Sequence, residues 1–139
     1  MSIYVTLSSD KSLQYFPHNK PYRFKSHLNA PLLLEGVWRV ALVESDIVCT
    51  TSRTDAIYLY SEVCGQSIVE GENRPLLRRL SPSAVGNWST IIEAPQYVPV
   101  KNNNIYDIDV NITTSRDDLA SFLDKPSTIT LHFKSFPFF

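Results

Sequence analysis

The chain has 139 residues, which suits one domain that buries roughly two-thirds of its unfolded surface around a single core. Its 13 Lys and Arg residues against 14 Asp and Glu residues give a formal net charge of -1, without the positive excess that phosphate contacts demand of a nucleic-acid binder. No apolar run approaches the roughly 18 residues of a membrane span, and the opening stretch SIYVTLSSD lacks the layout of a signal peptide, so we expect no sequence-specific nucleic-acid binding, no membrane span and no secretion.

Apolar and polar residues alternate with a period of two through most of the chain, which predicts β-strands with one wet face. In chain order the predicted strands cover residues 2–8, 22–28, 37–44, 56–63, 75–81, 89–100, 105–113 and 127–134. In the seventh strand the pattern points four side chains inward, namely Tyr106, Ile108, Val110 and Ile112. In the eighth, the inward residues are Ile129, Leu131 and Phe133, and the outward ones are Thr128, Thr130, His132 and Lys134.

The best helical window is 115–126, where the apolar residues at 119, 122 and 123 share one helical face and Pro126 ends the run. We expect one or two turns of helix there at most. About eight antiparallel strands without a helical layer bury their apolar faces by stacking two sheets or closing a barrel. The prediction is therefore an all-β fold, a β-sandwich of about eight antiparallel strands with minimal helix, in one domain over residues 1–139.

Candidate catalytic and metal-binding residues are sparse. Asp107 and Asp109 share one strand face with carboxylates roughly 6–7 Å apart, a separation that suits an inverting glycosidase but that any alternating strand also gives its solvent face. No neighbouring residue in the sequence predicts the desolvation that would raise one of their pKa values. His18, His27 and His132 are not at metal-ligand spacing. We therefore expect no catalytic residue, no metal and no cofactor.

The two cysteines, Cys49 and Cys64, are too few for a zinc site and too far apart for a redox motif. Reduced thiols are the usual state of cysteines in the cytoplasm or nucleus. The cysteine content therefore agrees with a protein made in one of those compartments.

Arginines and aromatic residues are the other notable features. Arg78 and Arg79 are adjacent on a predicted strand and so point to opposite faces, which calls for an edge position or a protein partner for at least one of them. The last residues, KSFPFF, would expose an apolar patch if they stayed free. The stretch YFPHNKPYRF (15–24) combines four aromatics with basic residues, as a single-strand nucleic-acid groove does, but a chain that crosses a sheet edge has the same composition.

Four blocks of the sequence, in order, resemble one protein family. The block FPHNKPYRFKSHLNAPLLLEGVWRVALVE (16–44) is similar to the N-terminal signature of the penton, or minor capsid, proteins of Polinton/Maverick elements and adintovirus-like DNA viruses. Its matching positions are Phe16, Pro17, Asn19, Phe24, Leu28, Leu34, Gly36, Trp38, Val40, Ala41, Leu42 and Glu44. The later blocks are RPLLRRL (74–80), YVPVKNNNIYDIDVNI (97–112) and ASFLDKPSTITLHFK (120–134). Longer relatives carry an insertion after the strand that ends at Glu44, which only SDIVCTTSRTDA (45–56) replaces here.

The resemblance implies a single jelly-roll capsid protein that forms homopentamers at the fivefold vertices of an icosahedral shell. Its partners would be four further copies of itself and the major capsid protein of the same virus or element, and its location the virion, or a host cell if the copy is domesticated. The resemblance implies that YFPHNKPYRF has a structural role: it runs along the edge of the sandwich into a strand, with Tyr22 and Phe24 packed inward. We expect the subunit interface to include Arg78, Arg79, Tyr97, Val98, Pro99, Val100, Phe136, Pro137, Phe138 and Phe139.

Two alternatives stay open at the level of sequence. A jelly-roll binding module for a carbohydrate or protein ligand would expose an aromatic platform, for which Trp88 and Tyr97 are candidates. A hydrolase would use Asp107 and Asp109 as its carboxylate pair.

Overall fold

Strands are the regular structure of the part of the chain that is described. The computed structural model describes residues 2–49, 56–69, 71–114 and 118–136, and these contain no helix and therefore no helix able to cross a membrane. The strands are β1 (Ser2–Ser8), β2 (Arg23–Leu33), β3 (Val37–Asp46), β4 (Ile57–Tyr60), β5 (Ser67–Val69), β6 (Glu72–Arg74), β7 (Leu76–Leu80), β8 (Thr90–Ile91), β9 (Val98–Pro99), β10 (Asn104–Thr114) and β11 (Thr128–Phe136).

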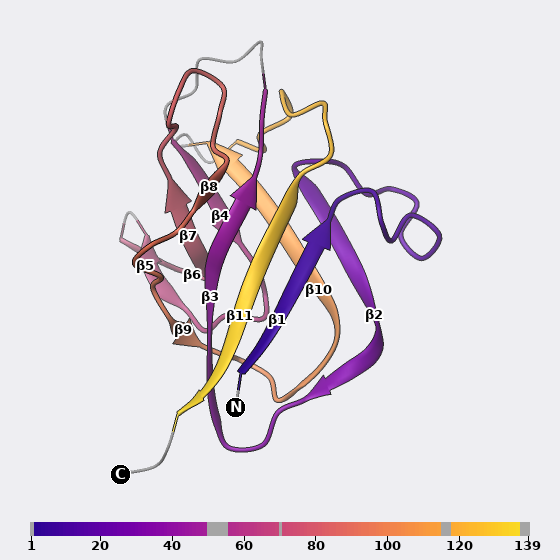
Figure 1. Cartoon of the computed structure of the whole chain (residues 1–139), viewed down its shortest axis with the longest axis vertical. Helices are drawn as coiled ribbons and strands as arrows, with labels where there is room; N and C mark the ends of the chain where they lie inside the picture. The colour runs from indigo at the N-terminus through magenta and orange to yellow at the C-terminus, as the bar shows by residue number, and fades with distance from the viewer. Residues whose placement is uncertain (1, 50–55, 70, 115–117, 137–139) are drawn as a thin grey trace.

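Two antiparallel sheets stack face to face (Figure 1). The first sheet has the order β1-β11-β3-β8, with β9 also paired to β3, and the second has the order β2-β10-β4-β7. The short hairpin of β5 and β6 stands apart from both. The predicted all-β sandwich of antiparallel strands is confirmed.

The pairing of the strands is nested along the chain. β1 pairs with β11, β2 with β10, β3 with β8 and β9, and β4 with β7. A long antiparallel ribbon that is rolled into two sheets produces this order, and double-sheet jelly rolls are wound in such a way. The strand order therefore supports the jelly-roll class, which stays a prediction.

One cluster of buried apolar residues fills the space between the sheets. Both sheets contribute to it through inward positions of their strands, such as Phe133 and Leu131 of β11 and Ile108 and Ile112 of β10. These four side chains are fully buried, which confirms the alternation predicted for most of the two strands.

The alternation fails at Tyr106. The register of β10 against β2 shifts between Ile105 and Asp107, so a β-bulge places an extra residue there. Ile105 is 4% exposed and Tyr106 is 56% exposed. The prediction that Tyr106 points inward is wrong because the bulge reverses which residue faces the core.

The predicted helical turns within 115–126 are also wrong for residues 118–126, which form turns and a β-bridge; residues 115–117 lie outside the described part. Ala120 N–H donates to Ile112 O at 2.9 Å, and Thr114 N–H donates to Asp118 O at 2.8 Å. These bonds tie the segment to β10. The tertiary contact with β10 therefore replaces the helical bonds that the apolar spacing favoured.

The segment 15–24 leads the chain into β2. Phe24 is buried and Tyr22 packs half-buried against the core, so both inward predictions are confirmed. The Asn19 side chain donates to Lys25 O at 2.8 Å and accepts from Lys25 N–H at 3.0 Å, on the edge of the sheet that faces away from β10. The segment therefore closes the edge of β2, which is an architectural role.

Candidate functional site

An aromatic cluster lies on the outer face of the first sheet. We define it as Tyr4, Tyr97, His132 and Phe136 together with the cations Arg39 and Lys134. Tyr4 of β1 lies opposite His132 of β11, which in turn lies opposite Ala41 of β3. Tyr97 directly precedes β9, which pairs with β3 on the side opposite to β11. The registers of these strands therefore bring the side chains of Tyr4, His132 and Tyr97 into one row across the sheet.

The rings of the cluster touch one another. Tyr4 stacks on His132 with 4.3 Å between ring centroids and 9° between planes. Tyr97 Oη forms a hydrogen bond of 2.8 Å with His132 Nδ1, and its ring meets the Phe136 ring edge-on at 6.2 Å. Two segments predicted separately as interface, 97–100 and 136–139, are thus neighbours through Tyr97 and Phe136.

His132 is a buried residue on an outward strand position. The sequence correctly predicts its face but not its burial, since it is 8% exposed beneath the two tyrosines. Burial, and secondly the charge of Lys134, lower the pKa of His132 below its usual value, so the imidazole is neutral near pH 7. Nε2 of this ring has no hydrogen-bond partner in the described part of the chain.

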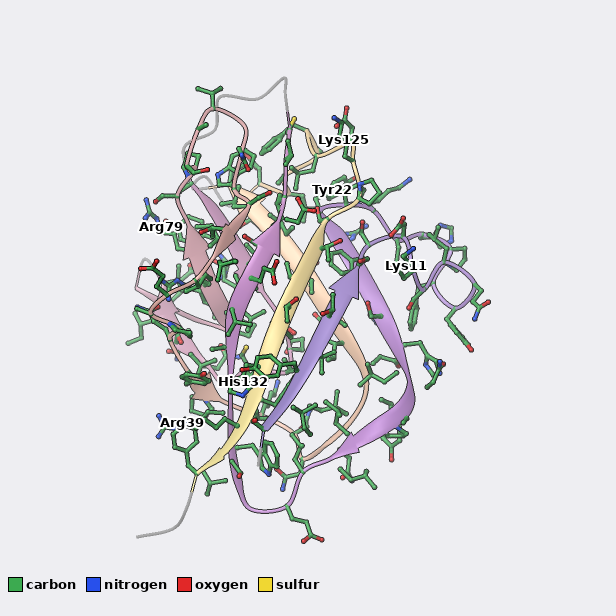
Figure 2. The ribbon with its side chains drawn as sticks, in the orientation of Figure 1. Lys11, Tyr22, Arg39, Arg79, Lys125 and His132 are labelled. Carbon is green, nitrogen blue, oxygen red and sulfur yellow. The ribbon has the colours of Figure 1, made fainter. Side chains whose placement is uncertain are left out.

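Two cations border the cluster. The Arg39 guanidinium lies 5.0 Å from the Phe136 ring, and Lys134 Nζ lies 5.6 Å from Phe136 and 5.9 Å from Tyr97. Neither cation has an ion-pair partner among the described residues. Figure 2 shows Arg39 and His132 in the same lower part of the first sheet. The cluster is therefore an aromatic surface with a positive border.

The backbone of residues 98–100 is used within the subunit. Val98 pairs with Val40, Pro99 O accepts a hydrogen bond of 2.8 Å from Gly65 N–H, and Val100 N–H donates to Trp38 O. Of the predicted segment 97–100, the Tyr97 ring is the part that joins the cluster. Pro137, Phe138 and Phe139 lie outside the described residues.

The predicted arginines lie in the second sheet, on the edge strand β7, and do not join the cluster. Arg78 lies opposite Leu59, and its Nη1 donates to Ala94 O at 3.1 Å. Arg79 points to the outer face, lies over Tyr58 at 5.9 Å and donates to Ser81 Oγ at 3.3 Å. An edge position thus accommodates both side chains, and Arg78 bonds within its own subunit.

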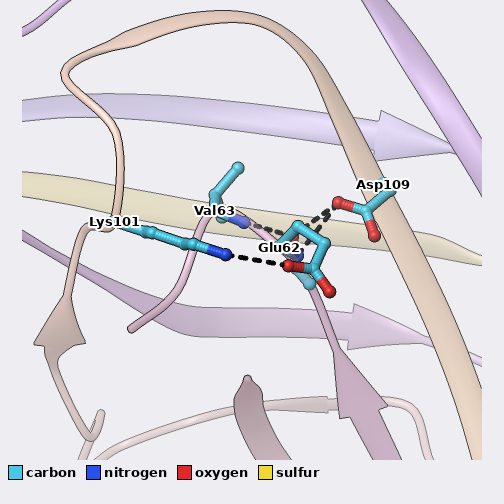
Figure 3. Close-up of polar contacts among 5 residues, drawn as sticks. Glu62, Val63, Lys101 and Asp109 are labelled. Carbon is cyan, nitrogen blue, oxygen red and sulfur yellow. Dashed lines mark hydrogen bonds and ion pairs between the residues drawn. The ribbon is translucent and has the colours of Figure 1, made fainter. Parts of the chain in front are cut away.

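The predicted carboxylate pair lies on the outer face of the second sheet, along a hollow of about 240 Å³ that Glu62 also lines. Asp107 Oδ1 is 3.0 Å from His27 Nδ1. Asp109 Oδ1 accepts a 3.0 Å hydrogen bond from Glu62 N–H, and Lys101 Nζ is 3.3 Å from Glu62 Oε2 (Figure 3). Asp109 therefore holds the turn after β4 against β10.

Asp109 and the neighbouring Cys64 have shifted pKa values. Burial raises the pKa of Asp109 above its usual value, against the opposing effect of the hydrogen bond from Glu62 N–H. The expectation that nothing desolvates this carboxylate pair is therefore wrong. Burial, assisted by the charges of Asp109 and Glu62, raises the pKa of Cys64 to about 12, so this thiol stays protonated.

Replacing Asp109 with asparagine should change how stability depends on pH. The pKa of the Asp109 carboxyl is higher in the folded state than its unperturbed value of 3.8, so the protein takes up protons when it folds at pH values between the two pKa values. The contribution of Asp109 to the free energy of unfolding therefore becomes less favourable as pH rises. The asparagine side chain keeps an oxygen acceptor for Glu62 N–H without the charge. We expect the unfolding free energy of Asp109→Asn, relative to the original protein, to rise between about pH 3 and pH 7 in urea titrations.

The Asp107→Asn protein is the matched control, since it removes a charge from the same strand face outside this buried position. A relative stability of Asp109→Asn that falls with rising pH would contradict the burial of an unfavourable charge at position 109.

A second hollow, of about 510 Å³, opens where the segment before β2 folds over the outer face of the second sheet. Its lining residues are Tyr15, Phe16, Pro17, His18, Asn19, Arg23, Phe24, Lys25, Asp109 and Asn111. Its volume is within the range of small-molecule sites. Trp88, predicted as one platform for a ligand, is 1% exposed in the core, so that prediction is wrong.

Across the described ranges, no three His, Cys, Asp or Glu side chains come together in a way that would hold a metal ion.

No model of a known protein family and no curated protein sequence matches the chain. The resemblance of its four sequence blocks to penton proteins therefore stays a prediction.

Proposed function

We propose that this protein is a structural, penton-like capsid subunit that assembles as a homopentamer at an icosahedral vertex. The observation that carries the proposal is the aromatic cluster, in which Tyr97 and Phe136 from two distant segments form one surface. The four sequence blocks that resemble penton proteins, and a strand order compatible with a jelly roll, support the same function.

The composition of the cluster suits a contact between proteins. Tyrosine, phenylalanine and arginine are enriched in interfaces, where a few aromatic anchors provide most of the binding energy. Tyr4 is 67% exposed and Val37, opposite Phe136, is 40% exposed, so apolar area remains for a partner to cover. His132 is neutral near pH 7, so covering it does not desolvate a charge.

The proposed partners are other copies of this chain and, around the ring, the major capsid protein. Closed rings use heterologous contacts, in which the surface of one subunit meets a different surface of the next. Arg39 and Lys134 would then pair with carboxylates that the neighbour presents. The protein acts without a catalytic step in this role, and its location is the virion.

The mass of the purified protein in solution tests the proposal. Light scattering after size exclusion, over a tenfold concentration range, should show a species of five times 15.8 kDa. Tyr4→Ala should raise the concentration for half-assembly by about 70-fold, because each of the five contacts of the ring loses an anchor of about 2 kcal/mol and the loss is spread over four association steps. Tyr106→Ala is the matched control, because it removes a similarly exposed tyrosine from the second sheet and should leave the mass unchanged.

A monomer at every concentration would contradict self-assembly into a ring and would favour the second candidate, a binding module. The hollow of about 510 Å³ beside β2 is the observation that favours this candidate. A thermal-shift screen against glycans, with Lys25→Ala as the variant of the hollow, would then test it.

A further inference from the structure

The sandwich has four sheet edges, formed by β1 and by β8 with β9 in the first sheet and by β2 and β7 in the second. An edge strand presents unpaired backbone N–H and C=O groups to other chains, and proteins usually block such edges. Among the described residues, the edges at β8 with β9 and at β7 are blocked, and so is the first half of the β2 edge.

In the first half of β2, alternate residues have outward backbone groups that are bonded. Arg23 exchanges two backbone hydrogen bonds with Lys20, at 2.9 and 3.1 Å. Two residues on, the Asn19 side chain satisfies both backbone groups of Lys25. Next, His27 N–H donates to Ser12 Oγ at 3.0 Å. The first half of this edge is closed to a further strand.

The β9 and β7 edges are blocked by other means. β8 and β9 have two residues each, Pro99 removes one backbone donor, and Gly65 N–H already occupies Pro99 O. β7 follows Pro75 and carries the charged residues Arg78 and Arg79, and charge on an edge strand discourages pairing.

The β1 edge carries none of these features. Its sequence, SIYVTLS, contains no charged residue, proline or glycine. Ser9 N–H donates to Ser127 O, so Ser9 directs its backbone groups toward β11. In an antiparallel pair every second residue does the same, and Ile3, Val5 and Leu7 therefore also direct their backbone groups to β11. The backbone groups of Ser2, Tyr4 and Thr6 then point away from the sheet, and the described part of the chain supplies no hydrogen bond to them.

An apolar seam lies beneath this open edge. Ile3 and Val5 point toward the core but stay half-buried, and on β2 the same is true of Leu28 and Leu32. β1 and β2 lie on the same side of the sandwich (Figure 1). Apolar side chains from both sheets thus remain partly uncovered where a further strand beside β1 would cover them.

We propose that β1 takes up an extended segment of a partner protein as an additional strand. The open backbone groups of Ser2, Tyr4 and Thr6 would hold the segment in register, as in other complexes formed by strand addition. The seam selects aliphatic side chains at alternate positions of the segment, and the hydroxyl-bearing outer face of β1 selects small polar ones between them. Charged residues would find no counter-charge on β1.

The shape of this side of the molecule favours a single extended chain over a second sandwich. The segment between β1 and β2 projects beyond the end of β1 on the same side (Figure 1), where it would obstruct a globular body that approached edge to edge. Two copies that paired through their β1 strands would be related by a twofold axis, and such a contact cannot form a fivefold ring, whose contacts are heterologous. The proposed strand addition uses the outward backbone groups of β1, whereas the ring contact uses the side chain of Tyr4 on the outer face of the same strand.

The probe for this inference is a capped seven-residue peptide of alternating valine and threonine, added to the full chain. We expect it to bind with a dissociation constant of about 1 mM or tighter and to slow amide exchange at Tyr4 and Thr6 by about tenfold, measured by NMR. Thr6→Pro removes an N–H that β11 does not use and should abolish the effect, whereas Thr6→Ala removes only the hydroxyl and should preserve it.

A second peptide, N-methylated at alternate residues, has the same side chains but cannot pair along one edge. Binding of this peptide as tight as that of the first, or no exchange protection by the first peptide, would overturn the inference, and neither result depends on the folding of a variant. Exchange protection of Thr6 that rises with protein concentration in the Tyr4→Ala protein, without peptide, would also overturn it, because a second copy would then occupy the edge although the ring contact is weakened.

Discussion

Replacing Trp88 with alanine should lower the free energy of unfolding by about 3–5 kcal/mol, as for other large aromatic residues in protein cores. The indole is 1% exposed and its ring lies 6.0 Å from Phe122. The backbone around it is also fixed, because Trp88 N–H donates to Ile47 O and Trp88 O accepts from Ser45 Oγ at 2.6 Å. Urea unfolding followed by circular dichroism measures the change.

Val85→Ala is the control from the same connection, since Val85 is 75% exposed and its truncation should change stability by no more than about 0.5 kcal/mol. A small effect of Trp88→Ala, equal to that of the control, would place the indole at the surface. The tryptophan would then again be a candidate platform for a ligand.

The second large effect is expected at the bulge in β10. Ile105→Ala should cost about 2–5 kcal/mol because it empties a position in the core. Tyr106→Ala, one residue further, should stay within about 0.5 kcal/mol because that ring is in solvent. The two variants are measured side by side by urea unfolding.

An uninterrupted strand would give the opposite result, since the alternation of the sequence points Tyr106 toward the core and Ile105 away from it. A large effect at Tyr106 with a small one at Ile105 would therefore show that the bulge is absent. The pair of variants decides the register of β10 without a further structure.

The strands were predictable because the signal for a strand is local. A period of two needs only a few residues, and the segments that became β1, β3, β10 and β11 show it over most of their length. The predicted bounds are less accurate where the strands are short. The single strand predicted over 89–100 is two strands, β8 and β9, with Pro95 in the connection between them. Ends and interruptions of strands depend on neighbours that the local pattern does not contain.

The candidate site was only partly predictable. Tyr97 and Phe136 were singled out as an edge residue and a tail residue, without any indication that they would touch. Tyr4 and His132 were missed, because outward alternation is normally a sign of exposure. Their pairing is a matter of register between β1 and β11, whose residues are more than a hundred positions apart in the chain.

The sequence by itself determined the class of fold, the alternation along the longer strands and the near-balance of 13 basic and 14 acidic residues, because composition and short-range alternation express these properties. The tertiary structure alone decided which edges are closed, where β10 bulges, and that His132 and Asp109 are buried. The closed edges, the bulge and the burial of these two side chains depend on which strands become neighbours and at what register. Packing between residues far apart in the sequence sets the neighbours and the register, and the local pattern of apolar residues does not contain this information.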